Sequence, residues 1–233
     1  MPHAGLFQYM PLKETQSSNG FQEIDRWDGG VGWIAYPDEA MQRASHAIAV
    51  DGDVWVIDPI DAPDLDDLLD EYGEVAGVVV LLGRHMRDAE KIARRHGVPL
   101  YLPTWVRRSV TGIPVRRFET SLADTGFRVL KLFDNPAWQE AGLYDESTGT
   151  LIVPESIGTV DYFRTERERL GVHPMVRLLP PDELRGLTPE RILVGHGAGV
   201  FDSAAATLAD ALDGSRRRYP SLLASTVRRF API

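Results

Sequence analysis

Residues 81–103 read LLGRHMRDAEKIARRHGVPLYLP, and this stretch decides the fold. The apolar run over residues 75–82 lacks the alternation of a half-exposed strand, which predicts a central strand buried on both faces. A polar turn follows, and Asp88 is expected to cap a helix that Gly97 stops before a second short strand. A turn that carries His85 and Asp88 between a buried strand and a helix is a common place for metal chemistry.

Strands and helices of the same kind are predicted on both sides of this unit. VGWIAY, HAIAV and VWVID read as strands, with a hairpin turn at residues 51–53 and an amphipathic helix over residues 62–73 that Asp61 would cap. The strand FRVLKLF, the hairpin GLYDESTGTLIV, the strand RILV and a helix opening near Asp202 or Ser203 follow. Two ββαβ-like halves predict an α/β (α+β) chain folded as an αββα four-layer sandwich.

Composition limits the classes of partner. The chain has 233 residues and a formal net charge of −9, which suits one domain over residues 1–233 and argues against a nucleic-acid partner. It has no cysteine, so a disulfide or a thiolate zinc site is excluded. No apolar run reaches the ~20 residues of a membrane helix, and residues 1–20 lack the features of a signal peptide. We expect a cytoplasmic protein with no membrane partner, and a loosely ordered segment at residues 1–20.

The order of these elements resembles the metallo-β-lactamase superfamily over roughly residues 31–200. The resemblance implies an αββα sandwich with a metal-binding cleft at one edge. Members usually carry the motif His-x-His-x-Asp-His after the central strand. A further histidine precedes the second hairpin, an aspartate follows it, and a last histidine follows the late strand.

Few of these ligands are present when the motif is carried over by position. Arg84 and Met86 stand where the first two histidines would be, Asp88 keeps the aspartate, and Ala89 replaces the last histidine of the motif. The segment FDNPAWQEAG contains no histidine, so the third histidine is missing. A shift of one residue would place His85 on a ligand position but would move Asp88 off its own.

Two residues of the second half match the family pattern by position. Glu155, in LIVPES, stands where the bridging aspartate is expected, and His196, in LVGHG, matches the last histidine. The resemblance therefore implies a cleft lined by Arg84, His85, Asp88, Glu155 and His196. His196 is equally well read as a histidine that is hydrogen-bonded to backbone, and Asp88 as a helix cap.

The preferred hypothesis is a protein with a decayed dinuclear zinc site and no metal, which binds a small molecule or a protein partner. If the protein is an enzyme, we expect a hydrolase, with His196, Glu155 and His85 as the candidate catalytic residues. The alternative is a single-metal hydrolase of an ester, thioester or phosphodiester, with Mn, Mg or Zn held by Asp88, Glu155 and His196. A structural or oligomerising subunit is a third hypothesis, and a homo-oligomer is left open.

A buried carboxylate needs a partner, which leads to a prediction about Arg84. Because guanidinium stays charged and can bridge carboxylates, Arg84, or failing that Arg87, is expected to pair with Glu155 or Asp88 as a built-in cation. The remaining histidines receive structural interpretations. We expect His46 to be a packed or edge residue, and we place His3 and His173 in surface loops.

Overall fold

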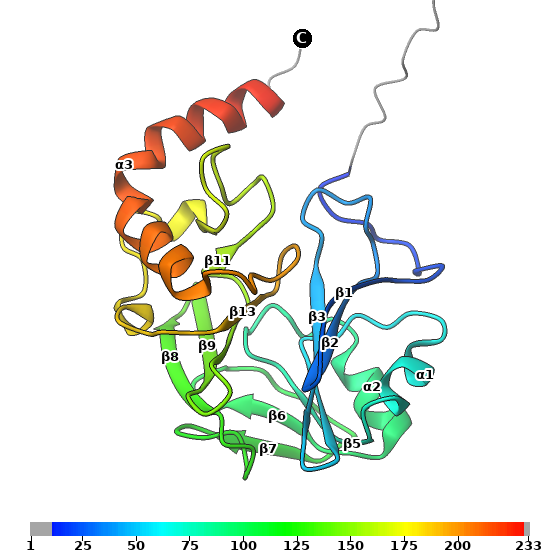
Figure 1. Ribbon diagram of the computed structural model, residues 1–233. Helices are drawn as coiled ribbons and strands as arrows, with labels where there is room; N and C mark the ends of the chain where they lie inside the picture. The colour runs from blue at the N-terminus through cyan, green and yellow to red at the C-terminus, as the bar shows by residue number, and fades with distance from the viewer. Residues whose placement is uncertain (1–10, 231–233) are drawn as a thin grey trace, which may run out of the picture.

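The computed structural model describes residues 11–230, without the side chains of residues 225–230. Two sheets pack face to face and helices cover their outer faces, which confirms the predicted αββα sandwich (Figure 1). None of the helices in this part of the chain combines the length and the apolar character that a membrane-spanning segment requires.

The first sheet has seven strands in chain order. The first four pair antiparallel and the last four pair parallel, so β4 belongs to both groups. The strands are β1 (Gln22–Trp27), β2 (Gly30–Ile34), β3 (Ala44–Val50), β4 (Asp53–Ile57), β5 (Glu74–Val79), β6 (Leu100–Pro103) and β7 (Val115–Phe118). The central strand of the opening motif, β5, lies between β4 and β6 as its apolar composition predicts.

The second sheet has the order β13-β10-β9-β8. Its strands are β8 (Arg128–Asn135), β9 (Trp138–Asp145), β10 (Thr150–Val153) and β13 (Arg191–Val194), and a small separate sheet pairs β11 (Ile157–Gly158) with β12 (Gly171–Val172). The helices are α1 (Leu65–Asp70), α2 (Ala89–His96) and α3 (Ala204–Phe230), with short 3₁₀ turns η1 (Pro174–Val176) and η2 (Asp182–Leu184).

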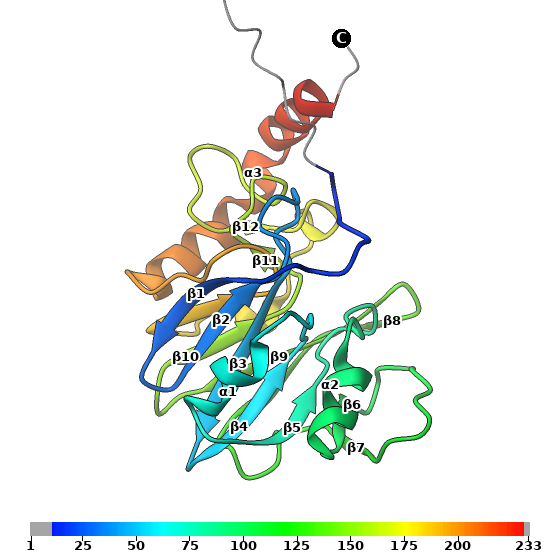
Figure 2. The same ribbon diagram turned by 90° about the vertical axis from the view of Figure 1, so that its right-hand side faces the viewer.

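Alternating side chains of the second sheet build two cores. Ile152 and Leu193 point toward the first sheet, whereas Leu151 and Val194 point toward α3 and pack with Leu208. This division follows from the two-residue repeat of a strand. The helices α1 and α2 cover the other face of the first sheet, whereas α3 lies on the far side of the second sheet (Figures 1 and 2).

Parallel pairing brings the functional turns to one edge. The strand β10 pairs parallel with β13, so Glu155 and His196, each two residues beyond a strand end, leave the sheet at the same edge. In the first sheet β4 pairs parallel with β5, and the turns after Ile57 and Val79 reach the same region. The fold therefore collects side chains from both sheets without any long loop.

Two helix details differ from the sequence prediction. The helix expected over residues 62–73 is shorter, because the left-handed backbone of Asp64, with φ 61°, precedes its first residue. The prediction that Asp61 caps this helix was wrong, since its carboxylate pairs with Lys91 and Arg95 of α2 instead.

A buried ion pair fixes the segment between β11 and η1. The guanidinium of Arg177 lies 2.6 Å from the carboxylate of Glu168, and neither side chain is exposed. Arg177 also donates to the carbonyl oxygens of Val172 and Phe163. Because Phe163 and Val172 flank the edge described above, this pair sets where the segment lies against it.

We expect the Arg177→Ala variant to lose about 3 kcal/mol of unfolding free energy, because Glu168 would lose its fully buried partner and keep only Arg218, at 3.3 Å, as a cationic partner. Urea denaturation measures this loss. The matched control is Arg185→Ala, which removes an exposed arginine paired with Asp182 and Asp213 and should cost about 0–1 kcal/mol. Equal losses in the two variants would contradict the structural role of the buried pair.

Candidate metal centre

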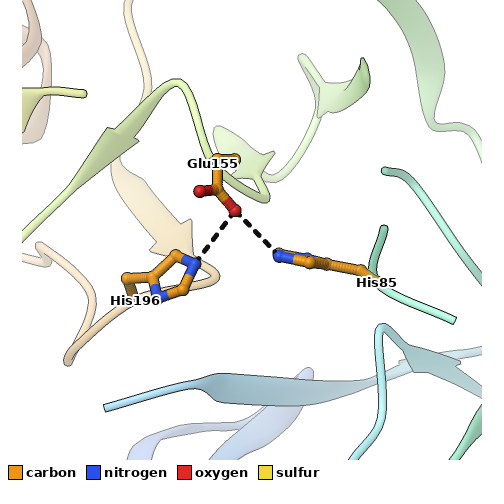
Figure 3. A group of neighbouring side chains, drawn as sticks. All are labelled: His85, Glu155 and His196. Carbon is orange, nitrogen blue, oxygen red and sulfur yellow. Dashed lines mark hydrogen bonds and ion pairs between the residues drawn. The ribbon is translucent and has the colours of Figure 1, made fainter. Parts of the chain in front are cut away.

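Three buried side chains meet at the edge where the parallel strands end. His85 follows β5, Glu155 follows β10 and His196 follows β13. Their ligand-type atoms all lie within 4.8 Å of one another. The Nε2 atom of His85 is 2.9 Å from Oε2 of Glu155, and Nε2 of His196 is 3.1 Å from the same oxygen (Figure 3). Both imidazoles therefore converge on one carboxylate oxygen.

The Nδ1 atom of His196, the ring nitrogen that does not face Glu155, defines the tautomer of the ring. Its Nδ1 lies 2.9 Å from the carbonyl oxygen of Met41, which only accepts hydrogen bonds, so Nδ1 carries a hydrogen. Burial lowers the pKa of His196, against the opposing effect of Glu155, and favours the neutral ring. A neutral ring then directs the lone pair of Nε2 at Oε2 of Glu155.

His85 has the same arrangement with a stronger acceptor. Its Nδ1 lies 3.0 Å from Oδ2 of Asp58, and the other carboxylate oxygen of Asp58 accepts the backbone N–H of Leu81. Asp58 follows β4 directly and has a left-handed backbone with φ 45°. This conformation turns its side chain beneath the loop after β5, so that Nδ1 of His85 donates to Asp58 and Nε2 points toward Glu155.

The carboxylate of Glu155 divides its contacts between its two oxygens. Oε2 faces His85 and His196, and Oε1 lies 3.5 Å from both Arg84 and His173. Burial acts to raise the pKa of Glu155, but positive charge at the two Nε2 positions of His196 and His85, which lie within hydrogen-bond distance, outweighs it and holds that pKa below the usual range. Glu155 is therefore an ionised carboxylate inside the protein.

His173 is held as a neutral hydrogen-bond donor. The backbone N–H of Met175 donates to its Nδ1 at 3.2 Å, so the hydrogen of the neutral ring lies on Nε2, which faces Glu155. Burial lowers the pKa of His173 to about 4, against the opposing charge of Glu155. Edge contacts with the rings of Trp138 and Phe163 fix its orientation.

Two arginines place positive charge beside this group. Arg84 stacks over the ring of Trp138 at 4.2 Å and pairs with Glu155, so the predicted ion pair is confirmed. The guanidinium of Arg87 is enclosed and donates to the carbonyl oxygens of Ala44 and Asp58 at 2.7 and 2.8 Å. Its other terminal nitrogen lies 3.4 Å from Nε2 of His85, a long contact that leaves Oε2 of Glu155 without a donor from Arg87.

Glu140 clamps the turn that carries Glu155. Its Oε1 accepts the backbone N–H groups of Glu155 and Ser156 at 3.0 and 2.8 Å. Its Oε2 accepts the hydroxyl of Ser156 and the indole N–H of Trp138. Burial raises the pKa of Glu140, although these hydrogen bonds act to lower it. A buried glutamate on β9 therefore positions both the turn after β10 and the Trp138 ring beneath Arg84.

Solved structures resemble this chain at low sequence identity. The putative diflavin flavoprotein A 5 of Nostoc sp. PCC 7120 has a TM-score of 0.61 and 15% identity, covering 87% of this chain and 99% of that one. The DIM-1 metallo-β-lactamase exposed to ceftazidime has a TM-score of 0.59 and 10% identity, covering 86% and 100%. A metallo-β-lactamase from Hirschia baltica has a TM-score of 0.53 and 9% identity, covering 83% and 98%. The chain has the metallo-β-lactamase fold.

The likeness concerns the fold alone at these identities. No protein-family model and no curated protein sequence matches the chain. The chemistry of the edge must therefore be argued from its own residues.

The cluster fits one divalent metal ion. Two histidines with one glutamate are an established ligand set of catalytic zinc, and metal–ligand distances of that kind place the ligand atoms of a tetrahedral site roughly 3.3 Å apart. The 2.9 and 3.1 Å separations from Oε2 of Glu155 are close to this value. Asp58 and the Met41 carbonyl bind the outer nitrogens, as partners of metal-ligating imidazoles do. Among the described residues this is the one such group.

Asp88 does not join the cluster that was expected from its place in the motif. Its carboxylate accepts the backbone N–H of Asp61 at 2.9 Å, and it lines a separate pocket beside α1 and α2. The reason is the left-handed backbone of Arg87, with φ 38°, which precedes Asp88. The group that could hold a metal ion consists of His85, Glu155 and His196, whereas the predicted alternative set named Asp88 in place of His85. Asp88 is the N-cap residue of α2, as predicted, but its side chain makes no cap hydrogen bond.

The other histidine predictions had mixed outcomes. The prediction that His173 lies in a surface loop was wrong, since it is buried beside Glu155. His46 is packed, as predicted, and lies 3.3 Å from Asp25. His3 lies outside the described residues.

Sequence reasoning missed Asp58, Glu140 and His173 as site residues. An Asp-Pro step at the end of the predicted strand VWVID was a signal for Asp58, because the turn after one parallel strand lies beside the turn after the next. Glu140 directly precedes the apolar residues 141–144 of its strand, and an acidic residue buried in such a strand requires partners. His173 in His-Pro carried no signal that distinguishes it from a surface loop.

We expect the Glu140→Gln variant to lose about 1–3 kcal/mol of unfolding free energy, because an amide presents donors where two N–H groups and a hydroxyl now donate. Urea denaturation compared with the exposed Glu146→Gln variant measures the loss. A difference smaller than the error of the two measurements would argue against the clamp.

Proposed function

We propose that the protein is a metal-dependent hydrolase that uses one divalent metal ion held by His85, Glu155 and His196. The observation that carries the proposal is the convergence of three buried side chains on one point, with both Nε2 atoms at 2.9 and 3.1 Å from one oxygen of Glu155. Because Nδ1 of each ring already donates to Asp58 or to the Met41 carbonyl, each Nε2 could donate to Glu155 only as part of an imidazolium ion. A divalent cation among the three atoms satisfies them without those protons. An imidazole-rich set favours zinc over magnesium.

A bound divalent ion supplies Lewis acidity for attack of water on an ester, thioester or phosphodiester. The chain supplies the orientation. Asp58 and the Met41 carbonyl hold the two imidazoles with Nε2 directed inward. Arg84 adds a fixed positive charge on the side of Oε1, where negative charge that develops during hydrolysis would be stabilised.

His173 and the aromatic rings around the cluster keep Glu155 in place. The Nε2 hydrogen of His173 faces Oε1, so Glu155 offers Oε2 alone to an ion. The ring of Phe163 stacks on His196 with centroids 5.3 Å apart and shields it from water. A rigid and dry ligand set of this kind needs little rearrangement during a reaction.

A second candidate function is metal-free binding of a small molecule, and the arginines favour it. Arg84 and Arg87 already offset the charges of Glu155 and Asp58. In that case His85 and His196 would each have to carry a second proton for Nε2 to donate to Glu155. The metal content of the protein separates the two candidates.

The purified protein, produced without a histidine tag, is expected to bind one equivalent of zinc that survives dialysis. Glu155→Gln and His196→Ala should each lose that equivalent, since each removes one of three ligands. Asp88→Asn is the control and should retain it, because its carboxylate is bound to Asp61. Elemental analysis by mass spectrometry provides the measurement.

Hydrolysis of 4-nitrophenyl acetate and of bis(4-nitrophenyl) phosphate should follow the zinc content across these variants. If Asp88→Asn loses the metal as completely as Glu155→Gln, the proposed ligand set is refuted. Protein that binds no zinc after incubation with excess metal supports the metal-free candidate instead.

The Asp58→Asn variant tests how the histidines are oriented. The substitution removes the carboxylate charge of the group that accepts the Nδ1–H of His85. Zinc affinity should then weaken by about 10–100-fold, while the stoichiometry stays at one. Titration against a competing chromogenic chelator gives the affinity. Asp66→Asn provides the comparison and should leave zinc affinity unchanged, because Asp66 of α1 contacts His96 at the C-terminal end of α2 and not the cluster.

A further inference from the structure

A pocket of about 390 Å³ lies directly outside the candidate metal centre. Its walls come from the turn after β5, the loop after β6 and the β8–β9 turn, and they include Arg84, Arg107, Arg108 and Trp138. The volume suits a small organic molecule. Arg84 and Trp138 belong both to this pocket and to the surroundings of Glu155, so the pocket borders the metal centre through them.

The pocket is cationic in a protein of net charge −9. Three arginines line it, and no carboxylate is among its lining residues. Two of these arginines have an acidic partner outside the lining: Arg107 lies 3.3 Å from Asp134, and Arg84 lies 3.5 Å from Glu155. The chain as a whole repels anions, so a local group of three guanidinium groups is a departure from its general charge.

Hydrogen bonds brace the pocket and leave guanidinium donors for a ligand. The backbone N–H of Gly83 donates to the Gln139 carbonyl oxygen, and that of Arg107 donates to the Gln139 side chain, both at 3.0 Å. Arg108 donates from Nε to the carbonyl oxygen of Gly83. Within the part of the chain that the structure describes, the terminal nitrogens of Arg108 have no hydrogen-bond acceptor. The Nε hydrogen bond holds the Arg108 side chain in place, and its two terminal nitrogens can donate to a ligand.

Arg84 connects the pocket with the ligand set. Its guanidinium lies on the ring of Trp138, and the indole N–H of Trp138 is held by Glu140. Glu140 also holds the backbone of Glu155. Glu140 therefore supports both the pocket wall and the carboxylate of Glu155. This shared support fixes the distance between a group bound in the pocket and a substrate bond at the candidate metal centre.

We propose that this pocket binds the anionic group, a carboxylate or a phosphate, of a small-molecule substrate. The inference rests on the proposed function for the identity of the reacting bond, but the pocket itself does not depend on it. Arg107 and Arg108 hold the anion with forked donors that match either oxyanion, and Arg84 forms the inner wall. The substrate class is thus an anionic ester, thioester or phosphodiester rather than a neutral one.

Calorimetry on metal-free full-length protein at low ionic strength tests the pocket separately from the metal. The probes are phenyl phosphate and phenylacetate, with neutral phenylacetamide as the matched control ligand. At least one anion should bind with one-to-one stoichiometry, and Arg107→Gln with Arg108→Gln should weaken it tenfold or more. Affinity should also fall as salt is added, because the interaction is electrostatic.

The control variant is Arg94→Gln, an exposed arginine on α2 away from the pocket, which should change affinity less than twofold. The single Arg107→Gln variant gives a second reading if the double variant unfolds, and it should weaken binding at least threefold. Binding of neither anion by the wild type, equal binding of phenylacetamide, or unchanged affinity in Arg107→Gln would overturn the proposal. None of these outcomes bears on zinc stoichiometry, so the two proposals fail separately.

Discussion

The buried negative charge of Glu155 is the constraint on which the arrangement of the edge depends. An ionised carboxylate is costly inside a protein unless opposite charge or hydrogen bonds surround it. Here the partners come from separate parts of the chain: His85 from the first sheet, His196 from the second, and His173 from the segment after β11. The contacts of the Glu155 carboxylate therefore link both sheets and the segment that carries His173 at this edge.

The support of Glu155 is itself built from a second buried acid. Glu140 holds the backbone on both sides of the Glu155–Ser156 peptide and also the indole of Trp138. Since Arg84 lies on that indole, the guanidinium that offsets Glu155 is positioned by the same residue that positions Glu155. Two carboxylates thus have separate roles: burial raises the pKa of the structural one, and the histidines lower the pKa of the other.

Much of the fold was predictable from sequence because its signals are local. The apolar run before residue 82, the DGD turn and the RILV strand each specify an element from neighbouring residues alone, and the structure has all three. The edge strands β1 and β7 were not predicted, since alternation is weak in strands with exposed faces. Glu155 and His196 were placed at the edge because each directly follows a strand.

The rest of the site depends on long-range geometry that no local pattern contains. His85 and Glu155 are 70 residues apart in sequence, and a motif carried over by position favours Asp88 instead of His85. The deciding feature is the backbone of Arg87, whose positive φ directs Asp88 to Asp61 and leaves His85 facing inward. Positive φ at an arginine is uncommon and has no sequence signature, so this exchange of roles could only be seen in the folded chain.

The two oxygens of Glu155 separate a fixed cation from the position that we propose for a metal ion. Arg84 and the Nε2 hydrogen of His173 lie near Oε1, and the two imidazole lone pairs lie near Oε2. The group near Oε2, made of His85, Glu155 and His196, could hold a metal ion. Arg84 therefore places permanent charge on one side of the carboxylate and leaves the other side to this group.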